Sequence, residues 1–356
     1  MEIDITDLME KCQEINASDI HLTVGIPPTI RANGRLVRLG ETALRPADTL
    51  SLAQSFLDDK QFAILEETGE YDISVSASGK YRFRVNIFRQ RGTYAVAMRN
   101  VNSTLLTLEQ LGMPAAIRDF TKKSYGIVLV TGPTGSGKST TLATLLDIIN
   151  TERDCHIITL EDPIEFLHKH KRSIVNQREI GNDSQNYHTA LRASLREDPD
   201  VILIGEMRDH ESISIALTAA ETGHLVFSTL HTVGAAKTID RIIDVFPPNQ
   251  QQQIRIQLSM TLQGVISQQL IPTKDGLHRV AAPEIMFATP AIRNLIRESK
   301  TPQINNAIAT GAAFGMTTMD NSLLTLFKSG RISYDEMLLH SVDPDYIRMN
   351  STKPRE

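Results

Sequence analysis

The sequence has little cysteine, no tryptophan and no long apolar run. Its two cysteines, Cys12 and Cys155, lie far apart and form no CxxC pair. They cannot build a four-ligand zinc site or a disulfide framework, so we expect a protein of a reducing cytosol. No apolar run approaches the ~18 residues that span a bilayer. The acidic start, MEIDITDLMEK, also lacks the apolar core of a secretory signal. We therefore expect any action on a membrane to come from the cytoplasmic side, through partners.

The sequence also lacks an excess of positive charge. Lysine and arginine number 37 against 42 aspartates and glutamates, which leaves a net charge of −5. A global attraction to nucleic acid or anionic lipid is therefore not expected. Apolar residues make up 41% of the 356 residues, and a globular chain of this length can bury two separate cores.

Residues 1–100 predict a small mixed α/β domain. A strand in 18–25 and a hairpin with its turn at Asn33-Gly34 come first. One helix is expected from Pro46 to Glu67. Three strands follow, with turns at Ser78-Gly79 and Arg91-Gly92. In the middle strand, apolar residues alternate with polar ones, so the two sets should point to opposite faces. The apolar set is Tyr81, Phe83, Val85 and Ile87, and the polar set is Arg82, Arg84 and Asn86.

Residues 101–110 predict a linker to a larger domain over 111–356, in which strands and helices alternate. Continuous apolar strands separated by helices are typical of a parallel sheet covered on both faces. The expected strands are 126–130, 156–161, 201–206 and 224–230, with helices through Asn150, near 184–197 and at 209–222. After Phe246 the pattern becomes almost wholly helical, and 277–287 is the one later strand expected.

The segment GPTGSGKST carries a complete phosphate-binding motif, G-x-x-x-x-G-K-[ST], between an apolar strand and a helix. Glycines let backbone N–H groups turn toward phosphate oxygens, and the helix N-terminus adds its positive end. The lysine can reach the β and γ phosphates, and the serine hydroxyl can bind Mg²⁺. The predicted nucleotide-binding residues are Gly132, Pro133, Thr134, Gly135, Ser136, Gly137, Lys138, Ser139 and Thr140.

Carboxylates follow two other predicted strands. Glu206 ends one of them, and we interpret it as the base that orients the attacking water. Gly205 stands where many P-loop ATPases have a metal-binding aspartate, so another carboxylate must assist. Glu161, Asp162 and Glu165 are candidates for metal or water positioning, because carboxyl ends of parallel strands meet at one edge. For each alone, a solvated turn acid is the alternative. The expected metal ligands, partly through water, are Ser139, Glu161 and Glu206.

Histidines and arginines complete the candidate site. His224 and His231 bound one apolar strand and are interpreted as γ-phosphate sensors, with a structural role as the alternative. Residues 73–108 contain no acid, and Arg82 and Arg84 share one strand face there. We interpret them as reaching a nucleotide phosphate, where an arginine supplied in trans stabilises the transferred group. A solvated sheet face and a nucleic-acid surface are the alternatives.

Six segments together resemble the secretion ATPase superfamily of type II and type IV pilus systems. They are SDIHLTVG, YRFRVNIFRQRG, GPTGSGKSTT (Walker A), ITLEDPIE (Asp box), LREDPDVILIGEMRD (Walker B) and GHLVFSTLHT (His box). The resemblance spans essentially the whole chain. It implies a RecA-like P-loop ATPase domain with a helical C-terminal region, joined to a smaller PAS-like α+β domain. It also implies a cytoplasmic homohexamer that binds ATP and Mg²⁺, in which N-terminal arginines complete the site.

Within this superfamily, residues 235–247 and 291–298 resemble the branch that retracts type IV pili. Assembly ATPases usually have an extra N-terminal region and often a tetracysteine zinc element, and neither is expected here. The resemblance implies a motor for pilus retraction and twitching motility. It would be recruited to the inner face of the cytoplasmic membrane by an inner-membrane pilus platform protein, without membrane insertion or nucleic acid. The alternatives are an accessory retraction ATPase and, from another class, a RecA-like nucleic-acid translocase.

The segment PAIRNLIRESK, residues 290–300, predicts an amphipathic helix. We expect Ile292 and Ile296 to be buried, together with Leu295. Arg293 and Arg297 are expected in solvent, where they are available to transmit motion or to contact a partner.

Overall fold

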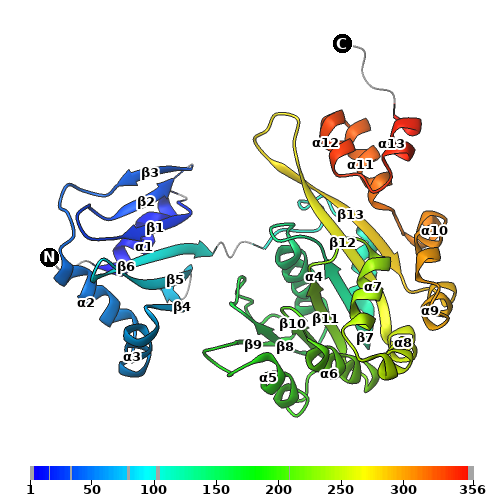
Figure 1. Ribbon diagram of the computed structural model, residues 1–356, viewed down its shortest axis with the longest axis horizontal. Coiled ribbons are helices and arrows are strands. Elements are labelled where there is room, and N and C mark those ends of the chain that lie inside the picture. The colour runs from blue at the N-terminus through cyan, green and yellow to red at the C-terminus, as the bar shows by residue number, and fades with distance from the viewer. Residues whose placement is uncertain are drawn as a thin grey trace. The chain divides into compact units, whose positions relative to one another are not determined.

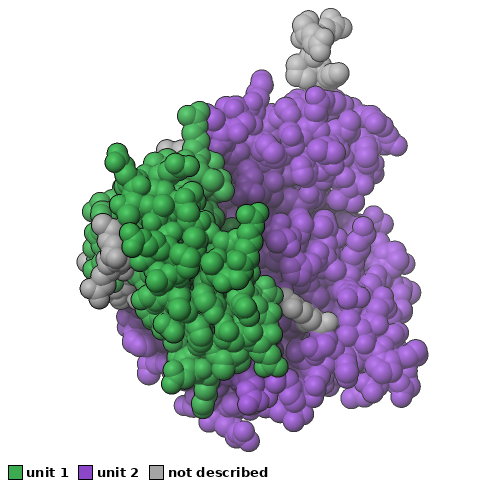
Figure 2. Space-filling view, turned by 60° about the vertical axis from the view of Figure 1, so that its left-hand side comes forward, with its two compact units in different colours: residues 1–104, 165–167 green, residues 105–164, 168–356 purple. Residues whose placement is uncertain are grey.

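The computed structural model describes residues 4–15, 17–32, 34–77, 81–101, 105–207 and 209–351. The chain divides into two compact units, coloured separately in Figure 2. The first consists of residues 1–104 with 165–167, and the second of 105–164 with 168–356. In the described part of the chain, no helix combines the length and apolar character that a membrane span requires.

The first unit is a six-stranded antiparallel sheet, in the order β3-β2-β1-β6-β5-β4, with three helices (Figure 1). Its strands are β1 (Asp19–Leu22), β2 (Thr29–Ala32), β3 (Arg35–Arg38), β4 (Glu70–Ala77), β5 (Tyr81–Gln90) and β6 (Thr93–Val101). Its helices are α1 (Ile5–Glu14), α2 (Pro46–Phe56) and α3 (Asp59–Thr68). One face of the sheet packs with the helices in a single hydrophobic core.

The alternation predicted for β5 is confirmed for the described side chains. Phe83, Val85 and Ile87 are fully buried, whereas Arg84 is exposed. The hairpin predicted around Gly34 is confirmed by the pairing of β2 with β3, although Asn33 itself lies outside the described residues. The predicted turn at Ser78-Gly79 also lies outside them.

The single helix expected from Pro46 to Glu67 is wrong, because α2 and α3 are separate helices. Asp58 begins the second one: its carboxylate accepts a hydrogen bond from the Gln61 backbone N–H at 2.8 Å. The Gln61 side chain in turn accepts one from the Asp58 N–H at 3.1 Å. This reciprocal capping box starts a new helix where the apolar pattern alone suggests continuity.

The second unit is a seven-stranded sheet in the order β13-β12-β7-β11-β10-β8-β9. All neighbours are parallel except β12 and β13, which form an antiparallel hairpin. The strands are β7 (Gly126–Thr131), β8 (His156–Glu161), β9 (Ile174–Glu179), β10 (Val201–Ile204), β11 (Leu225–Leu230), β12 (Leu262–Pro272) and β13 (Arg279–Phe287).

Helices cover both faces of this sheet, as the apolar strands predicted (Figure 1). One face packs against η1 (Ala115–Lys122) and α4 (Lys138–Glu152). The opposite face packs against α5 (Tyr187–Ser194), α6 (His210–Glu221), α7 (Ala235–Asp244), α8 (Pro248–Thr261), α9 (Pro290–Arg297) and α10 (Ile304–Ala309). The C-terminal helices α11 (Met319–Lys328), α12 (Tyr334–Leu339) and α13 (Pro344–Asn350) share a separate core with β12 and β13. The short turn η2 (Thr301–Gln303) lies between α9 and α10, and η3 (Ala312–Phe314) lies between α10 and α11.

The expectation of one strand after Phe246 is wrong, because β12 precedes β13. The sequence of β12, LQGVISQQLIP, is interrupted by glycine and by polar residues, which weakens any strand pattern. Its pairing with β7 on one side and β13 on the other places it inside the sheet. The edge strand β9 was not expected either.

Candidate active site

Four parallel strands of the second unit end at the same edge of the sheet. The phosphate-binding loop follows β7, the Asp-box acids end and follow β8, Glu206 lies beyond β10, and His231 follows β11. Since ligands of open α/β sheets bind at the carboxyl ends of the strands, this edge is the candidate active site.

Glycines give the phosphate-binding loop its path between β7 and α4. Gly132 has φ of +143°, and a Cβ atom there would lie 2.2 Å from the Gln268 carbonyl oxygen. Gly135 and Gly137 also have positive φ angles, of +77° and +86°, which side chains disfavour. Gly137 is the N-cap of α4 and brings no side-chain cap. The first turn of α4 is therefore free of a capping side chain and suited to an anion.

The Lys138 side chain folds back over this loop and is buried. Its ammonium donates hydrogen bonds to the carbonyl oxygens of Gly132 at 2.9 Å and of Pro133 at 3.0 Å. These two bonds hold the ammonium beside the phosphate-binding loop. Such acceptors can be exchanged for phosphate oxygens, to which the ammonium would bind more strongly.

Glu206 and His231 form a close pair at the same edge. The His231 Nε2 atom lies 3.1 Å from the Glu206 Oε2 atom, within hydrogen-bond distance. The Glu206 side chain is 16% exposed and that of His231 54% exposed. The pair opens into a hollow of about 310 Å³. This hollow is also lined by Met207, Ile213, Leu230, Thr232, Arg241 and Val245. The pair can orient a water molecule, with the carboxylate as acceptor and the imidazole as its support.

The three Asp-box acids differ in their surroundings. Glu161 is half-buried, and its Oε1 atom accepts hydrogen bonds from the Thr159 hydroxyl at 2.6 Å and from Gln177 Nε2 at 3.2 Å. Asp162 and Glu165 are exposed, and Glu165 belongs to the first unit. Glu161 is therefore the Asp-box carboxylate with a defined orientation at this edge.

Close packing around Gly205 leaves no room for a side chain at this position. A Cβ atom at this position would lie 2.7 Å from the Tyr187 hydroxyl and 3.2 Å from the Leu160 carbonyl oxygen. The Gly205 carbonyl also accepts a hydrogen bond from the Thr229 hydroxyl at 2.6 Å. An aspartate, present here in many P-loop ATPases, would not fit without moving Tyr187.

His224 is not brought to this edge. It precedes the first residue of β11, whereas His231 follows the last, so the strand separates them by about 20 Å. The His224 Nδ1 atom lies 3.0 Å from the Ala219 carbonyl oxygen at the end of α6. Its contacts are those of a residue that completes a helix terminus.

Arg82 and Arg84 lie on β5 in the first unit, on the face opposite the core. An Arg84 guanidinium nitrogen lies 3.8 Å from an Asp72 carboxylate oxygen, too far for a strong ion pair. Arg84 is also the direct cross-strand neighbour of Arg99. Arg99 is in turn paired with Asp19, whose carboxylate oxygen lies 3.0 Å from the Arg99 Nε atom.

The model of the family described as type II/IV secretion system protein matches residues 1–325. The chain belongs to this family. Among its relatives, the chain is 51% identical over 331 residues to the type IV pilus retractation ATPase PilT of Pseudomonas aeruginosa, covering 93% of this chain and 96% of that protein. It is 35% identical over 347 residues to the type IV pilus ATPase PilU of the same organism, covering 98% and 91%.

A solved family structure has the same fold. The crystal structure of the pilus retraction motor PilT with bound ADP is 47% identical. It superimposes with a TM-score of 0.91 and covers 98% of this chain and 100% of that one. The α/β fold of this chain, with one antiparallel-sheet unit and one mixed-sheet unit, is therefore that of the family.

One residue beside the phosphate-binding loop, Gln268 on β12, was missed by sequence reasoning. It is 1% exposed, and its Nε2 atom donates a hydrogen bond to the Ser136 carbonyl oxygen at 2.5 Å. The strand that carries it was not expected, so the sequence offered no signal of its place beside the loop.

Mg²⁺ suits the residues at this edge. Nowhere among the described residues do three or more His, Cys, Asp or Glu side chains cluster as a metal site. Mg²⁺ bound with nucleotide needs only one or two protein oxygens, because phosphates and water supply the rest. The half-buried Ser139 hydroxyl in the first turn of α4 and the Glu161 carboxylate are such donors.

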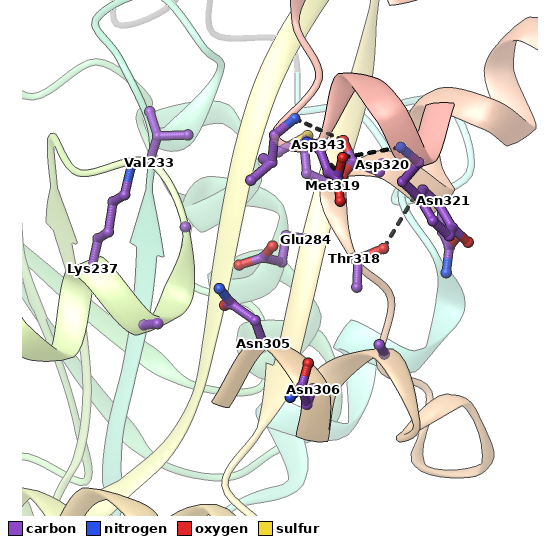
Figure 3. A pocket seen from close by; sticks show the side chains of 15 residues that line it. Val233, Lys237, Glu284, Asn305, Asn306, Thr318, Met319, Asp320, Asn321 and Asp343 are labelled. Atoms are coloured by element: carbon purple, nitrogen blue, oxygen red, sulfur yellow. Dashed lines mark hydrogen bonds between the residues drawn. The ribbon is translucent and has the colours of Figure 1, made fainter. Parts of the chain in front are cut away.

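A second hollow, of about 500 Å³, lies where the loop after His231 approaches the C-terminal helices (Figure 3). Glu284 projects into it from β13 and is 7% exposed. Its Oε1 atom accepts a hydrogen bond from the Ala235 N–H, at the start of α7, at 2.7 Å. Burial raises the pKa of the Glu284 carboxyl above its ordinary value of 4.5. The Asp320 carboxylate on the other wall accepts from the N–H groups of Val342 and Asp343.

Proposed function

We propose that this chain is an ATP-hydrolysing motor that powers retraction of type IV pili, and thereby twitching motility. Two findings support the proposal together. The chain is 51% identical to a PilT over nearly its full length. It also has the phosphate-binding loop and the Glu206–His231 pair at one edge of the sheet. The Glu206–His231 contact is the single observation that supports hydrolysis, because nucleotide binding alone does not require a carboxylate held by a histidine.

In this proposal, each residue at the edge has a role. Backbone N–H groups within residues 134–140 bind the phosphates, and Lys138 exchanges its carbonyl partners for phosphate oxygens. Glu206 orients the attacking water, while His231 holds the Glu206 carboxylate in position. Mg²⁺, when bound, supplies positive charge to the phosphate oxygens, and Ser139, Glu161 and Glu206 would hold it, partly through water. Asp162 and Glu165 are assigned to water or metal positioning.

The finer architecture is proposed from the same resemblance. Residues 1–100 form a PAS-like domain, 101–110 a linker, and 111–356 a RecA-like ATPase domain with a helical C-terminal part. Six copies form a ring on the cytoplasmic side of the inner membrane, recruited by a pilus platform protein. Arg82 and Arg84 complete a nucleotide site in that ring.

The test of hydrolysis is Glu206→Gln. We expect kcat for ATP to fall by about 10²- to 10⁴-fold, the usual worth of a positioned base. The affinity for ADP should stay close to that of the wild type. Normal hydrolysis by this variant would overturn the assignment of Glu206.

The test of retraction is deletion of the gene in the source organism. Excess surface pili with lost surface motility supports a retraction motor, whereas loss of pili would indicate an assembly motor.

Two alternative functions have tests of their own. Stimulation of ATP hydrolysis by DNA or RNA would favour a nucleic-acid translocase. The lower identity to PilU, 35%, favours the principal motor over an accessory one. To separate the principal from the accessory motor, the gene for this chain is expressed in strains that lack either pilT or pilU, and restored motility is scored in each.

The arginines are tested by mixing subunits. Arg82→Ala or Arg84→Ala subunits combined with Lys138→Ala subunits should recover part of the ATPase activity if the arginine acts on a neighbouring subunit's nucleotide. Mixed rings without recovery would contradict action in trans.

A further inference from the structure

Gln268 links two parts of the nucleotide site that are far from it in sequence. Its Nε2 atom donates to the Ser136 carbonyl oxygen at 2.5 Å, and its Oε1 atom accepts from the Thr141 hydroxyl at 2.9 Å. Ser136 belongs to the phosphate-binding loop, and Thr141 lies in the first turns of α4. The side-chain amide therefore joins the loop, the helix and β12.

The direction of this amide is determined by its partners. The Ser136 carbonyl can only accept a hydrogen bond, so Nε2 must face Ser136, and Oε1 then accepts from the Thr141 hydroxyl. The amide is buried, and it packs against the loop: a Cβ atom at Gly137 would lie 3.1 Å from Nε2. A buried amide with both ends bonded has one orientation, because the reversed one would set oxygen against the Ser136 carbonyl.

Holding the Ser136 carbonyl also orients the next N–H group. In a trans peptide, the C=O and the following N–H point in opposite directions. With the Ser136 oxygen held toward β12, the Gly137 N–H points away from β12. Gly137 has no Cβ atom to restrict rotation of its peptide, and its φ is +86°. Without the Gln268–Ser136 hydrogen bond, this peptide could turn over. Its carbonyl oxygen would then face the phosphate-binding site and repel a phosphate.

We propose that Gln268 is a positioning residue for nucleotide binding, which holds the Ser136–Gly137 peptide with its N–H toward the diphosphate. The inference rests on the proposed function, in that the ligand is a nucleoside diphosphate or triphosphate. Gln268 itself does not touch the reacting atoms. It preorganises the loop, so its loss should appear in affinity more than in turnover.

The experiment measures the dissociation constant of ADP for four purified proteins: wild type, Gln268→Leu, Thr141→Val and Gln269→Leu. Gln268→Leu should weaken ADP binding about 10-fold, the order of a lost buried hydrogen bond, and raise the KM for ATP more than it lowers kcat. Thr141→Val should weaken binding less. Gln269→Leu is the matched control, because the Gln269 side chain points to the opposite face and contacts His340. It should bind ADP as the wild type does.

A further variant separates positioning from packing. In Gln268→Glu the ionised carboxylate cannot donate to Ser136, but the protonated acid can. Its ADP affinity should therefore recover toward that of the wild type as pH falls through the pKa of the introduced carboxyl, while Gln269→Glu shows no such recovery.

Wild-type ADP affinity in Gln268→Leu, or equal loss in both leucine variants, would overturn the proposal. A lower melting temperature without nucleotide, with ADP affinity retained, would do the same, since the role would then be structural. Should Gln268→Leu not fold, Thr141→Val and the pH recovery of Gln268→Glu decide the matter. Failure of wild type itself to bind ADP would count instead against the proposed function.

Discussion

The Nε2 atom of His231 lies 3.1 Å from the Oε2 atom of Glu206. The two residues come from different loops, and the parallel pairing of β10 with β11 brings them together. Ile204 lies beside Ser228 in that pairing, so both strands end at the same edge of the sheet. The contact therefore depends on the register of two buried strands.

The pair predicts coupled effects on turnover. Because His231 acts through Glu206, His231→Ala should lower kcat for ATP, but less than Glu206→Gln does. The double variant should be no slower than Glu206→Gln alone. Once the Glu206 carboxylate is lost, His231 no longer has a base to position, so its removal should have no further effect on kcat. His224→Ala, at the opposite edge, is the comparison and should affect kcat less than His231→Ala. Multiplicative losses in the double variant, measured by steady-state ATPase assay, would contradict this coupling.

Arg293 predicts an effect on stability. Its guanidinium donates to the carbonyl oxygens of Ser259 and Met260, both at 2.8 Å, and so caps the C-terminus of α8. Burial also lowers its pKa. Arg293→Ala should reduce the free energy of unfolding by about 2 kcal/mol, measured by urea denaturation. Arg297→Ala is the control: Arg297 is exposed and bonds only its helix neighbour Asn294 among the contacts described. It should change stability by less than ~0.5 kcal/mol, and equal losses would refute the capping role.

Gly205 predicts a steric conflict that a second change relieves. Gly205→Ala sets a methyl group 2.7 Å from the Tyr187 hydroxyl and should destabilise the fold by roughly 1–3 kcal/mol. Tyr187→Phe removes that hydroxyl, so the double variant should lose less than the sum of the single variants. Thermal unfolding of all four proteins measures the cycle. Strict additivity would show that the methyl group is accommodated elsewhere.

Glu284 predicts a pH dependence of stability. Its folded-state pKa is raised by burial above 4.5, so at a pH between the unfolded and folded pKa values the native state holds a proton that the unfolded chain has released. Stability from this group is complete below the unfolded value and is lost as pH rises through the folded one. Glu284→Gln stays neutral, so its free energy of unfolding should fall less than that of wild type from pH 4.5 upward. Glu41→Gln, at an exposed position, is the control and should follow wild type. Parallel curves for Glu284→Gln and wild type would contradict the raised pKa.

Much of the second unit could be predicted because its signals are local. The phosphate-binding loop needs glycines at particular φ angles next to one lysine, and that requirement is written in adjacent residues. Strands β7, β8, β10 and β11 are continuous apolar runs, since both of their faces are covered. The shared edge for the strand-end carboxylates then follows from the parallel sheet, whereas the contact between Glu206 and His231 was not predicted.

Other features depended on partners distant in the chain. The burial of Ile292 and Ile296 in α9 is confirmed, but Leu295, also expected to be buried, is only partly buried. Arg293 was expected in solvent, and it is instead half-buried with its guanidinium on two backbone carbonyls. Its partners lie 33 and 34 residues away in α8, and no periodicity reveals them. His224 matched His231 in sequence pattern, yet strand direction separates the two.

By itself, the sequence determined the phosphate-binding loop, the buried strands and the family, because short-range geometry and apolar patterning impose them. Only the tertiary structure decided that β12 joins the sheet and that Gln268 holds the loop. A polar strand is stable there because its side chains find buried partners, and those partners exist only once the chain has folded.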